Sequence, residues 1–148
     1  MTEDLLPENT LIALLDELIP ARSEALPGAG SLGTADLVKP KLGEATPLVA
    51  SGLEALDAKA VEQGATDFAA LSAEARTPIV QEVGTSHPGF LEVLIFHVYG
   101  AYYQNAKVAP ALGLKSGPPF PGGYELEPGD LGLLDPVRSR GKKMFRDV

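Results

Sequence analysis

HPGFLEVLIFHVYGAYYQNAKVAPALGL, residues 87–114, is the stretch that decides the fold of this chain. Pro88 suits the first turn of a helix, where its missing N–H is not needed. The residues that follow are apolar around nearly the whole helical circumference, and Glu92 is the only charge before Lys107, a pattern typical of a buried helix. The apolar run is also too short to span a bilayer, which needs about 20 residues. We therefore predict a buried central helix at about residues 88–105.

Helical patterns also precede this stretch, and no segment before it alternates with the period of two that strands show. A first helix is predicted from a cap at Asn9 or Thr10 to a stop at Pro20. A short second helix follows a cap at Thr34 and ends at Pro40. The predicted fold class is therefore all-α, a small helical bundle around the one buried central helix.

A third helix is predicted to begin at Thr46, with Pro47 in its first turn. Gly64 suits its C-terminal cap. Its predicted buried face consists of Leu48, Val49, Leu53, Leu56 and Val61.

The next segment allows two interpretations, because Pro78 lies too deep for an uninterrupted helix. Either the helix that Ser72 caps is kinked, or a second helix begins with Thr77 as its cap. We predict a short turn from residue 73, followed by a helix through Val83 that ends at Gly84.

The composition changes after Leu112, where residues 113–136 become rich in proline and glycine. Such a segment does not form a long helix or a central strand. Apolar residues nevertheless recur along it, as they do not in flexible linkers. We therefore predict a helical domain at residues 1–112 and an extended, Pro/Gly-rich partner-docking strap and tail at 113–148.

The strap and the basic residues after it supply the candidate partner-binding residues. Prolines order an extended backbone in advance, so less entropy is lost on docking, and aromatic side chains offer large contact areas. The candidates are Pro118, Pro119, Phe120, Pro121, Tyr124, Leu126, Arg138 and Arg140. Docking within the chain follows the same physics as docking onto a partner, and the basic run suits an acidic partner, a cofactor phosphate or the chain's own acidic body equally well.

Composition excludes several classes of function. The chain has no cysteine, which rules out disulfides and thiolate metal sites, and its two histidines make up at most half of a His-rich metal site, so no metal site is predicted. A net charge of −8 argues against a nucleic-acid partner. The charge is uneven, with 5 Lys/Arg against 15 Asp/Glu in residues 1–100 and 7 against 5 in residues 101–148. The N-terminus shows neither a signal peptide nor a twin arginine, so the sequence by itself predicts a cytoplasmic location.

His97, Tyr99 and Tyr103 form the one candidate ligand site. A histidine with a pKa near neutrality can act as a general base or a ligand, and tyrosines at this spacing can line a pocket. Aromatic residues at helical spacing are more often core residues, and we favour that interpretation for all three. The carboxylate pairs Asp16–Glu17 and Glu125/Glu127 are each local, and we predict that they are solvated.

No nucleophile elbow, phosphate loop or zinc spacing is present, and no catalytic residue is predicted.

Several motifs together resemble the gluconate 2-dehydrogenase subunit 3 family. They are LDELIP at residues 15–20, LPGAG at 26–30, LVASGLEALDAKAVEQGATDFAALSAEAR at 48–76, FLEVLIFHVYGAYYQN at 90–105 and ALGLKSGPPFPGGYELE at 111–127. The resemblance implies a small helical subunit that performs no redox chemistry and binds no cofactor itself. It implies a large FAD-containing partner of the glucose-methanol-choline type that oxidises a sugar, polyol or glycoside, and whose maturation or stability the small subunit supports.

Members of this family often carry a twin-arginine signal, which this sequence lacks. A periplasmic location is therefore expected only if the chain is exported together with its partner. Two other interpretations remain open. One is a ligand-binding domain or small enzyme that uses His97 and the nearby tyrosines, and the other is a homo-oligomer in which the strap wraps a second copy.

Overall fold

The computed structural model describes residues 6–114 and 129–140 of the 148-residue chain. Within these ranges the chain forms seven α-helices, several short 3₁₀ turns and no strand, which confirms the predicted all-α class. The chain divides into two compact units, residues 1–117 and 118–148, and each is described here by itself.

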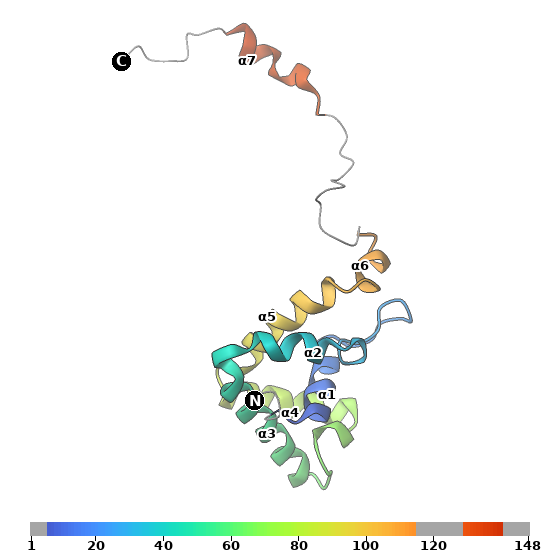
Figure 1. Cartoon of the computed structure of the whole chain (residues 1–148), viewed down its shortest axis with the longest axis vertical. Coiled ribbons are helices and arrows are strands. Elements are labelled where there is room, and N and C mark those ends of the chain that lie inside the picture. The colour runs from blue at the N-terminus through green and yellow to red at the C-terminus, as the bar shows by residue number, and fades with distance from the viewer. Residues whose placement is uncertain (1–5, 115–128, 141–148) are drawn as a thin grey trace, which may run out of the picture. The chain divides into compact units, whose positions relative to one another are not determined.

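α1 (Glu8–Leu18) lies at the centre of the first unit, where it contacts three other helices (Figure 1). These are α2 (Thr34–Val38), α3 (Thr46–Glu62) and α4 (Ala73–Ser86). The apolar stripe of α1 explains this position, because Leu11, Leu14 and Leu15 are fully buried. The predicted cap at Asn9 or Thr10 is wrong, since the helix already begins at Glu8.

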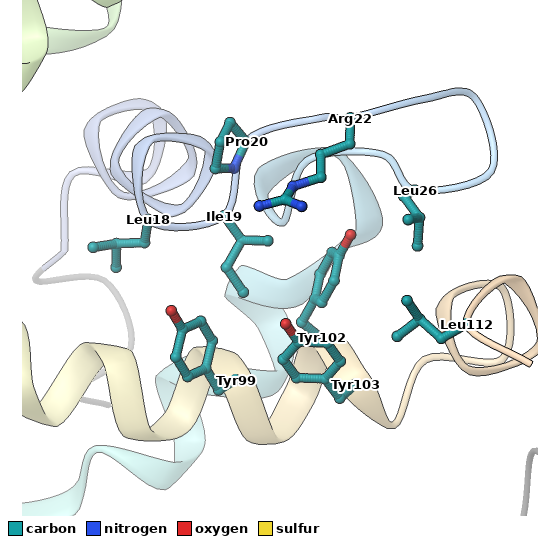
Figure 2. A pocket seen from close by; sticks show the side chains of 9 residues that line it. All are labelled: Leu18, Ile19, Pro20, Arg22, Leu26, Tyr99, Tyr102, Tyr103 and Leu112. Atoms are coloured by element: carbon teal, nitrogen blue, oxygen red, sulfur yellow. The ribbon is translucent and has the colours of Figure 1, made fainter. Parts of the chain in front are cut away.

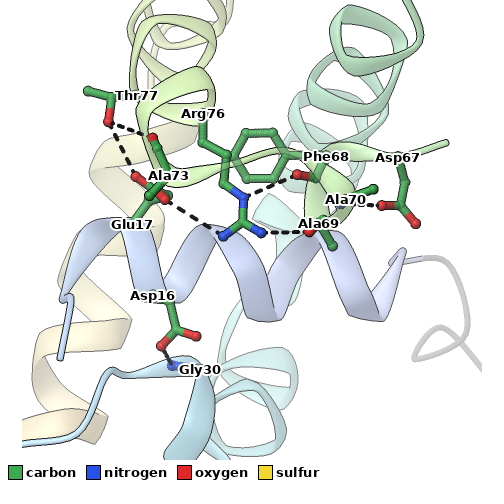
Figure 3. Close-up of polar contacts among 10 residues, drawn as sticks. All are labelled: Asp16, Glu17, Gly30, Asp67, Phe68, Ala69, Ala70, Ala73, Arg76 and Thr77. Atoms are coloured by element: carbon green, nitrogen blue, oxygen red, sulfur yellow. Dashed lines mark hydrogen bonds and ion pairs between the residues drawn. The ribbon is translucent and has the colours of Figure 1, made fainter. Parts of the chain in front are cut away.

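Asp16 anchors the loop that follows α1, as Figure 3 shows. Its Oδ1 accepts a hydrogen bond of 2.8 Å from the backbone N–H of Gly30. A Cβ at Gly30 would collide with the carbonyl oxygen of Ile12, and one at Gly28 would collide with the Asp16 carboxylate. The glycines of the LPGAG motif therefore allow the loop backbone to lie directly against α1.

α2 and α3 form where the sequence predicts them, with two corrections in detail. α3 begins at Thr46 as predicted, and Gly64 follows its end with φ +83°, a conformation that favours glycine. Thr34 is the first residue of α2 and not its cap, because Gly33 occupies the preceding position. On α3, Val61 was expected on the buried face but is 59 % exposed.

α4 is one continuous helix despite Pro78 in its second turn, so the predicted break there is wrong. Arg76 explains why the first turn holds, because its guanidinium donates to the carbonyl oxygens of Phe68 (3.2 Å) and Ala69 (2.6 Å). The same group lies 3.7 Å from the Glu17 carboxylate on α1 (Figure 3). These tertiary contacts offset the intrahelical hydrogen bond that proline removes.

α5 (Phe90–Tyr103) is buried on one side only, which corrects the prediction of a helix buried all round. It also begins later than predicted, because Gly89 has φ +88° and leaves Pro88 outside the helix. Phe90, Leu94, Val98, Ala101 and Tyr102 face the core. α5 packs on α2 and α3, which cover that side, and its opposite side keeps large apolar residues in solvent.

The short α6 (Val108–Ala111) completes the first unit.

The described part of the second unit is a 3₁₀ turn, Leu131–Leu134, followed by α7 (Asp135–Ser139). The Asp130 carboxylate caps the turn by accepting the backbone N–H of Gly132 at 2.9 Å. Within residues 129–140, the large apolar side chains are exposed, namely Leu131, Leu133, Leu134 and Val137. Residues 115–128, which include most of the predicted strap, lie outside the described residues.

Candidate functional site

The exposed side of α5 presents a row of aromatic rings, which we call the α5 aromatic face: Phe96, Tyr99 and Tyr103. Phe96 is 75 % exposed, and the two tyrosines are 45 % and 48 % exposed. Tyr99 and Tyr103 lie one helical turn apart, with ring centroids separated by 5.9 Å. Tyr99 packs on Tyr103, and Phe96 lines the same hollow as Tyr99, so the three side chains share one exposed side of α5. Exposed apolar patches mark interaction sites on proteins.

One end of this face opens into a pocket of about 220 Å³, the tyrosine pocket, shown in Figure 2. Three tyrosines of α5 form one wall, and the end of α1 together with the following loop forms the other. The lining residues that matter here are Leu18, Ile19, Arg22, Tyr99, Tyr102 and Tyr103. Its aromatic and aliphatic walls suit an apolar group, and Arg22 adds a positive charge at the rim.

Tyr102 fixes the wall of this pocket. Its hydroxyl donates a hydrogen bond of 2.8 Å to the carbonyl oxygen of Pro27, and its ring is nearly buried. Burial raises the pKa of Tyr102, as does neighbouring Tyr103, and the Arg22 guanidinium partly offsets both. Tyr102 thereby connects α5 to the LPGAG loop.

Tyr102→Phe is expected to lower the free energy of unfolding by about 1 kcal/mol, the usual contribution of one hydrogen bond. The raised pKa also gives a pH dependence. The unfolded tyrosine loses its proton from about pH 10, before the folded one does, so stability falls as pH rises above that value. Urea unfolding at neutral and alkaline pH checks both effects. If the free energy of unfolding of the variant falls with rising pH as steeply as that of the wild type, Tyr102 is not the source of this pH dependence.

The other end of the α5 aromatic face borders an open groove, the Phe96 groove, of about 980 Å³. It is lined by Lys41, Glu92, Ile95, Phe96, His97 and Tyr99, among others. His97 packs edge-on against Phe96 with ring centroids 5.2 Å apart. Tyr99 lines both the groove and the tyrosine pocket, so the two hollows meet at this residue.

The structure separates the residues of the predicted ligand site. Tyr99 and Tyr103 line the tyrosine pocket, whereas His97 lines the Phe96 groove. His97 is only half-buried, and both tyrosines are exposed, so the expectation that all three are core residues is wrong. Among the described residues of both units, no group of three or more His, Asp or Glu side chains is arranged to hold a metal ion.

Asp16 and Glu17 were predicted to be solvated, and this is wrong. Asp16 binds the loop backbone, and Glu17 pairs with Arg76 and accepts from the Thr77 hydroxyl at 3.4 Å (Figure 3). Both carboxylates therefore hold the fold together.

Most of the predicted partner-binding residues are not described. Pro118, Pro119, Phe120, Pro121, Tyr124 and Leu126 lie outside the described residues, as do Glu125 and Glu127. Arg138 and Arg140 are described and exposed, and Arg138 pairs with Asp135 of the same unit at 3.2 Å. Their role in partner binding remains a prediction.

Two residues of the hollows were not recognised from the sequence. Arg22 comes from the loop after α1 and Lys41 from a 3₁₀ turn after α2. Neither belongs to a motif or a periodic pattern. Only the packing of these segments beside α5 brings them to its aromatic face.

Comparison with known proteins gives one match. The family model described as Gluconate 2-dehydrogenase subunit 3 matches residues 7–107, more than half of the chain and including all of α1 to α5. No significant similarity is found to curated proteins or to solved structures. In the ranges that the structure covers, no helix is both long and apolar enough to cross a membrane.

Proposed function

Since this chain belongs to the gluconate 2-dehydrogenase subunit 3 family, we propose that it is an accessory subunit of a dehydrogenase complex. In this proposal it performs no redox chemistry itself. It binds a large FAD-dependent subunit of the glucose-methanol-choline type, which oxidises a sugar or glycoside, and it supports the maturation or stability of that subunit. The family match over residues 7–107 is the observation that carries the proposal.

The surface chemistry of the chain supports a partner-binding role. Large apolar side chains stay exposed on the α5 aromatic face, and Leu131, Leu133 and Leu134 are 65 %, 76 % and 46 % exposed in the second unit. Apolar surfaces of this kind gain free energy when a partner removes them from water. In the proposal, the strap and basic tail contribute contacts to the large subunit.

A second candidate function rests on the tyrosine pocket. Its volume of about 220 Å³ lies below the usual size of pockets for drug-sized ligands, about 300–1,000 Å³, so it suits only a small apolar group. A small-molecule binder would show a ligand-dependent rise in melting temperature that Tyr103→Ala abolishes. An accessory subunit would be stabilised by its protein partner instead.

The first experiment is co-expression of this chain, tagged, with the large flavoprotein dehydrogenase subunit of the same host. We expect a yellow complex, and higher flavin content and dehydrogenase activity than when the large subunit is expressed alone. A colourless, solitary chain would contradict the accessory-subunit proposal. Light scattering on that solitary chain would then test whether it forms a homo-oligomer.

The contribution of the second unit is tested in the same experiment with three serine substitutions, Leu131→Ser, Leu133→Ser and Leu134→Ser. All three leucines are exposed, so the fold should remain intact while the yield of complex falls. Val61→Ser, an equally exposed apolar position on α3, is the matched control. An unchanged yield would exclude these leucines as contacts.

A further inference from the structure

Packing among the described residues does not explain why the aromatic rings of the α5 aromatic face are exposed. Its rings lie opposite the buried side of α5, and they neither fill the core nor carry a charge. Tyr99 and Tyr103 pack on each other, and Phe96 contacts only the edge of His97 among the aromatic rings described. Aromatic residues at this level of exposure are enriched in the centres of protein interfaces.

The described part of the first unit holds six Lys and Arg side chains: Arg22, Lys39, Lys41, Lys59, Arg76 and Lys107. Three of its basic residues pair with its own carboxylates, as Lys39 with Glu8, Lys59 with Glu62 and Glu82, and Arg76 with Glu17.

Arg22 and Lys41 form no ion pair with any described residue, and each lines one of the two hollows. Glu92 also lines the Phe96 groove but does not pair with Lys41 in the described structure. Lys107 also forms no ion pair with a described residue, but it lines neither hollow. Arg22 and Lys41 therefore place two positive charges beside the apolar centre. An occupant with carboxylates flanking apolar side chains complements this pattern.

The extent of the family match helps to identify the molecule that binds the α5 aromatic face. The match covers residues 7–107 and therefore contains α5, whereas the second unit begins at residue 118. A docking surface that members of the family share would lie within the matched region, whereas any contact of the second unit lies outside it. Among the described residues, the exposed large aromatic side chains are Phe96, Tyr99 and Tyr103, and all three belong to the α5 aromatic face.

We propose that the α5 aromatic face, with Arg22 and Lys41 at its two hollows, docks an apolar, carboxylate-bearing segment of the large dehydrogenase subunit. This inference rests on the proposed function and adds the surface and the chemistry of its partner. Phe96 and Tyr99 fill the centre of the contact, and the two cations orient the segment. The second unit provides a separate contact.

The test uses the co-expressed complex, with the double variant Phe96→Ser/Tyr99→Ser against the matched control Val61→Ser. We expect the double variant to dissociate from the immobilised large subunit about tenfold faster or more, the usual effect of removing aromatic residues from an interface centre. The control should behave as wild type. Circular dichroism and melting temperature establish that each variant is folded.

The charge contribution is tested separately with Lys41→Glu, which should weaken the complex, and Lys41→Arg, which should preserve it because the charge remains. Three outcomes are decisive. If wild type captures no flavoprotein, the proposed function fails and this inference with it. If wild type and the double variant bind the large subunit equally, the inference is overturned while the function stands. If the double variant only abolishes self-association, a second copy occupies the face and the inference is likewise overturned.

Discussion

Asp57→Ala is expected to lower the free energy of unfolding by about 2–4 kcal/mol, the largest loss we anticipate from a single side chain. One oxygen of this carboxylate, Oδ1, accepts two hydrogen bonds, from the hydroxyl of Thr10 at 2.6 Å and from the backbone N–H of Phe68 at 2.9 Å. Thr10 is 1 % exposed and Phe68 is fully buried. Alanine would leave both donors without this partner, and each buried group left unsatisfied costs about 1–3 kcal/mol.

The control for this prediction is Asp57→Asn, whose amide oxygen can still accept both bonds. It should lose only the additional strength of a charged acceptor and remain clearly more stable than the alanine variant. Urea unfolding followed by circular dichroism measures both. An equal loss in the two variants would mean that the charge, and not the acceptor geometry, joins α1, α3 and the 3₁₀ turn at Phe68–Ala70.

We expect Gly52→Ala to destabilise the protein by about 1–3 kcal/mol, although alanine is the better helix former. Gly52 lies inside α3, and a Cβ there would approach the Phe90 ring to 2.5 Å. Phe90 is fully buried and cannot move outward. The steric cost of overpacking therefore exceeds the gain of up to about 1 kcal/mol from helix propensity.

Gly100→Ala is the matched control, because Gly100 lies inside α5 and a Cβ there would meet no atom within 4 Å. It should leave stability unchanged or raise it by up to about 1 kcal/mol. Adding Phe90→Leu to Gly52→Ala should recover part of the loss, since a smaller side chain relieves the contact. Additive effects of the two substitutions would contradict a direct clash between α3 and α5.

Contacts between helices explain where prediction from the sequence failed. Hydrophobic periodicity located α1, α3 and α5 and their class correctly, because the burial of an apolar stripe follows from the helical repeat. The short α2 was located by the expected cap at Thr34 and the stop at Pro40. The sequence predicts a break at Pro78, because proline inside a helix removes a backbone hydrogen bond and clashes with the preceding turn. The structure keeps α4 continuous through the contacts of Arg76 with Glu17, which is distant in sequence, and with the carbonyl groups of Phe68 and Ala69 in the preceding 3₁₀ turn.

The candidate site was predictable only in part. The sequence indicated the aromatic residues of α5 but not which of them remain in solvent. A helix that is apolar all round is usually buried, yet the neighbours of α5 cover one side of it, and the rest is left exposed. The same limit applies to Arg22 and Lys41, which share a surface with α5 only after folding.

The sequence by itself determined the all-α class, the positions of most helices, the change in composition after residue 112 and the family resemblance. Each of these depends on residues close together in the chain, where periodicity and turn chemistry act directly. The tertiary structure decided that α1 lies at the centre, that α5 offers an aromatic face, and that Gly52 must lack a side chain. Those features depend on which helices meet, and that is set by the packing of surfaces far apart in sequence.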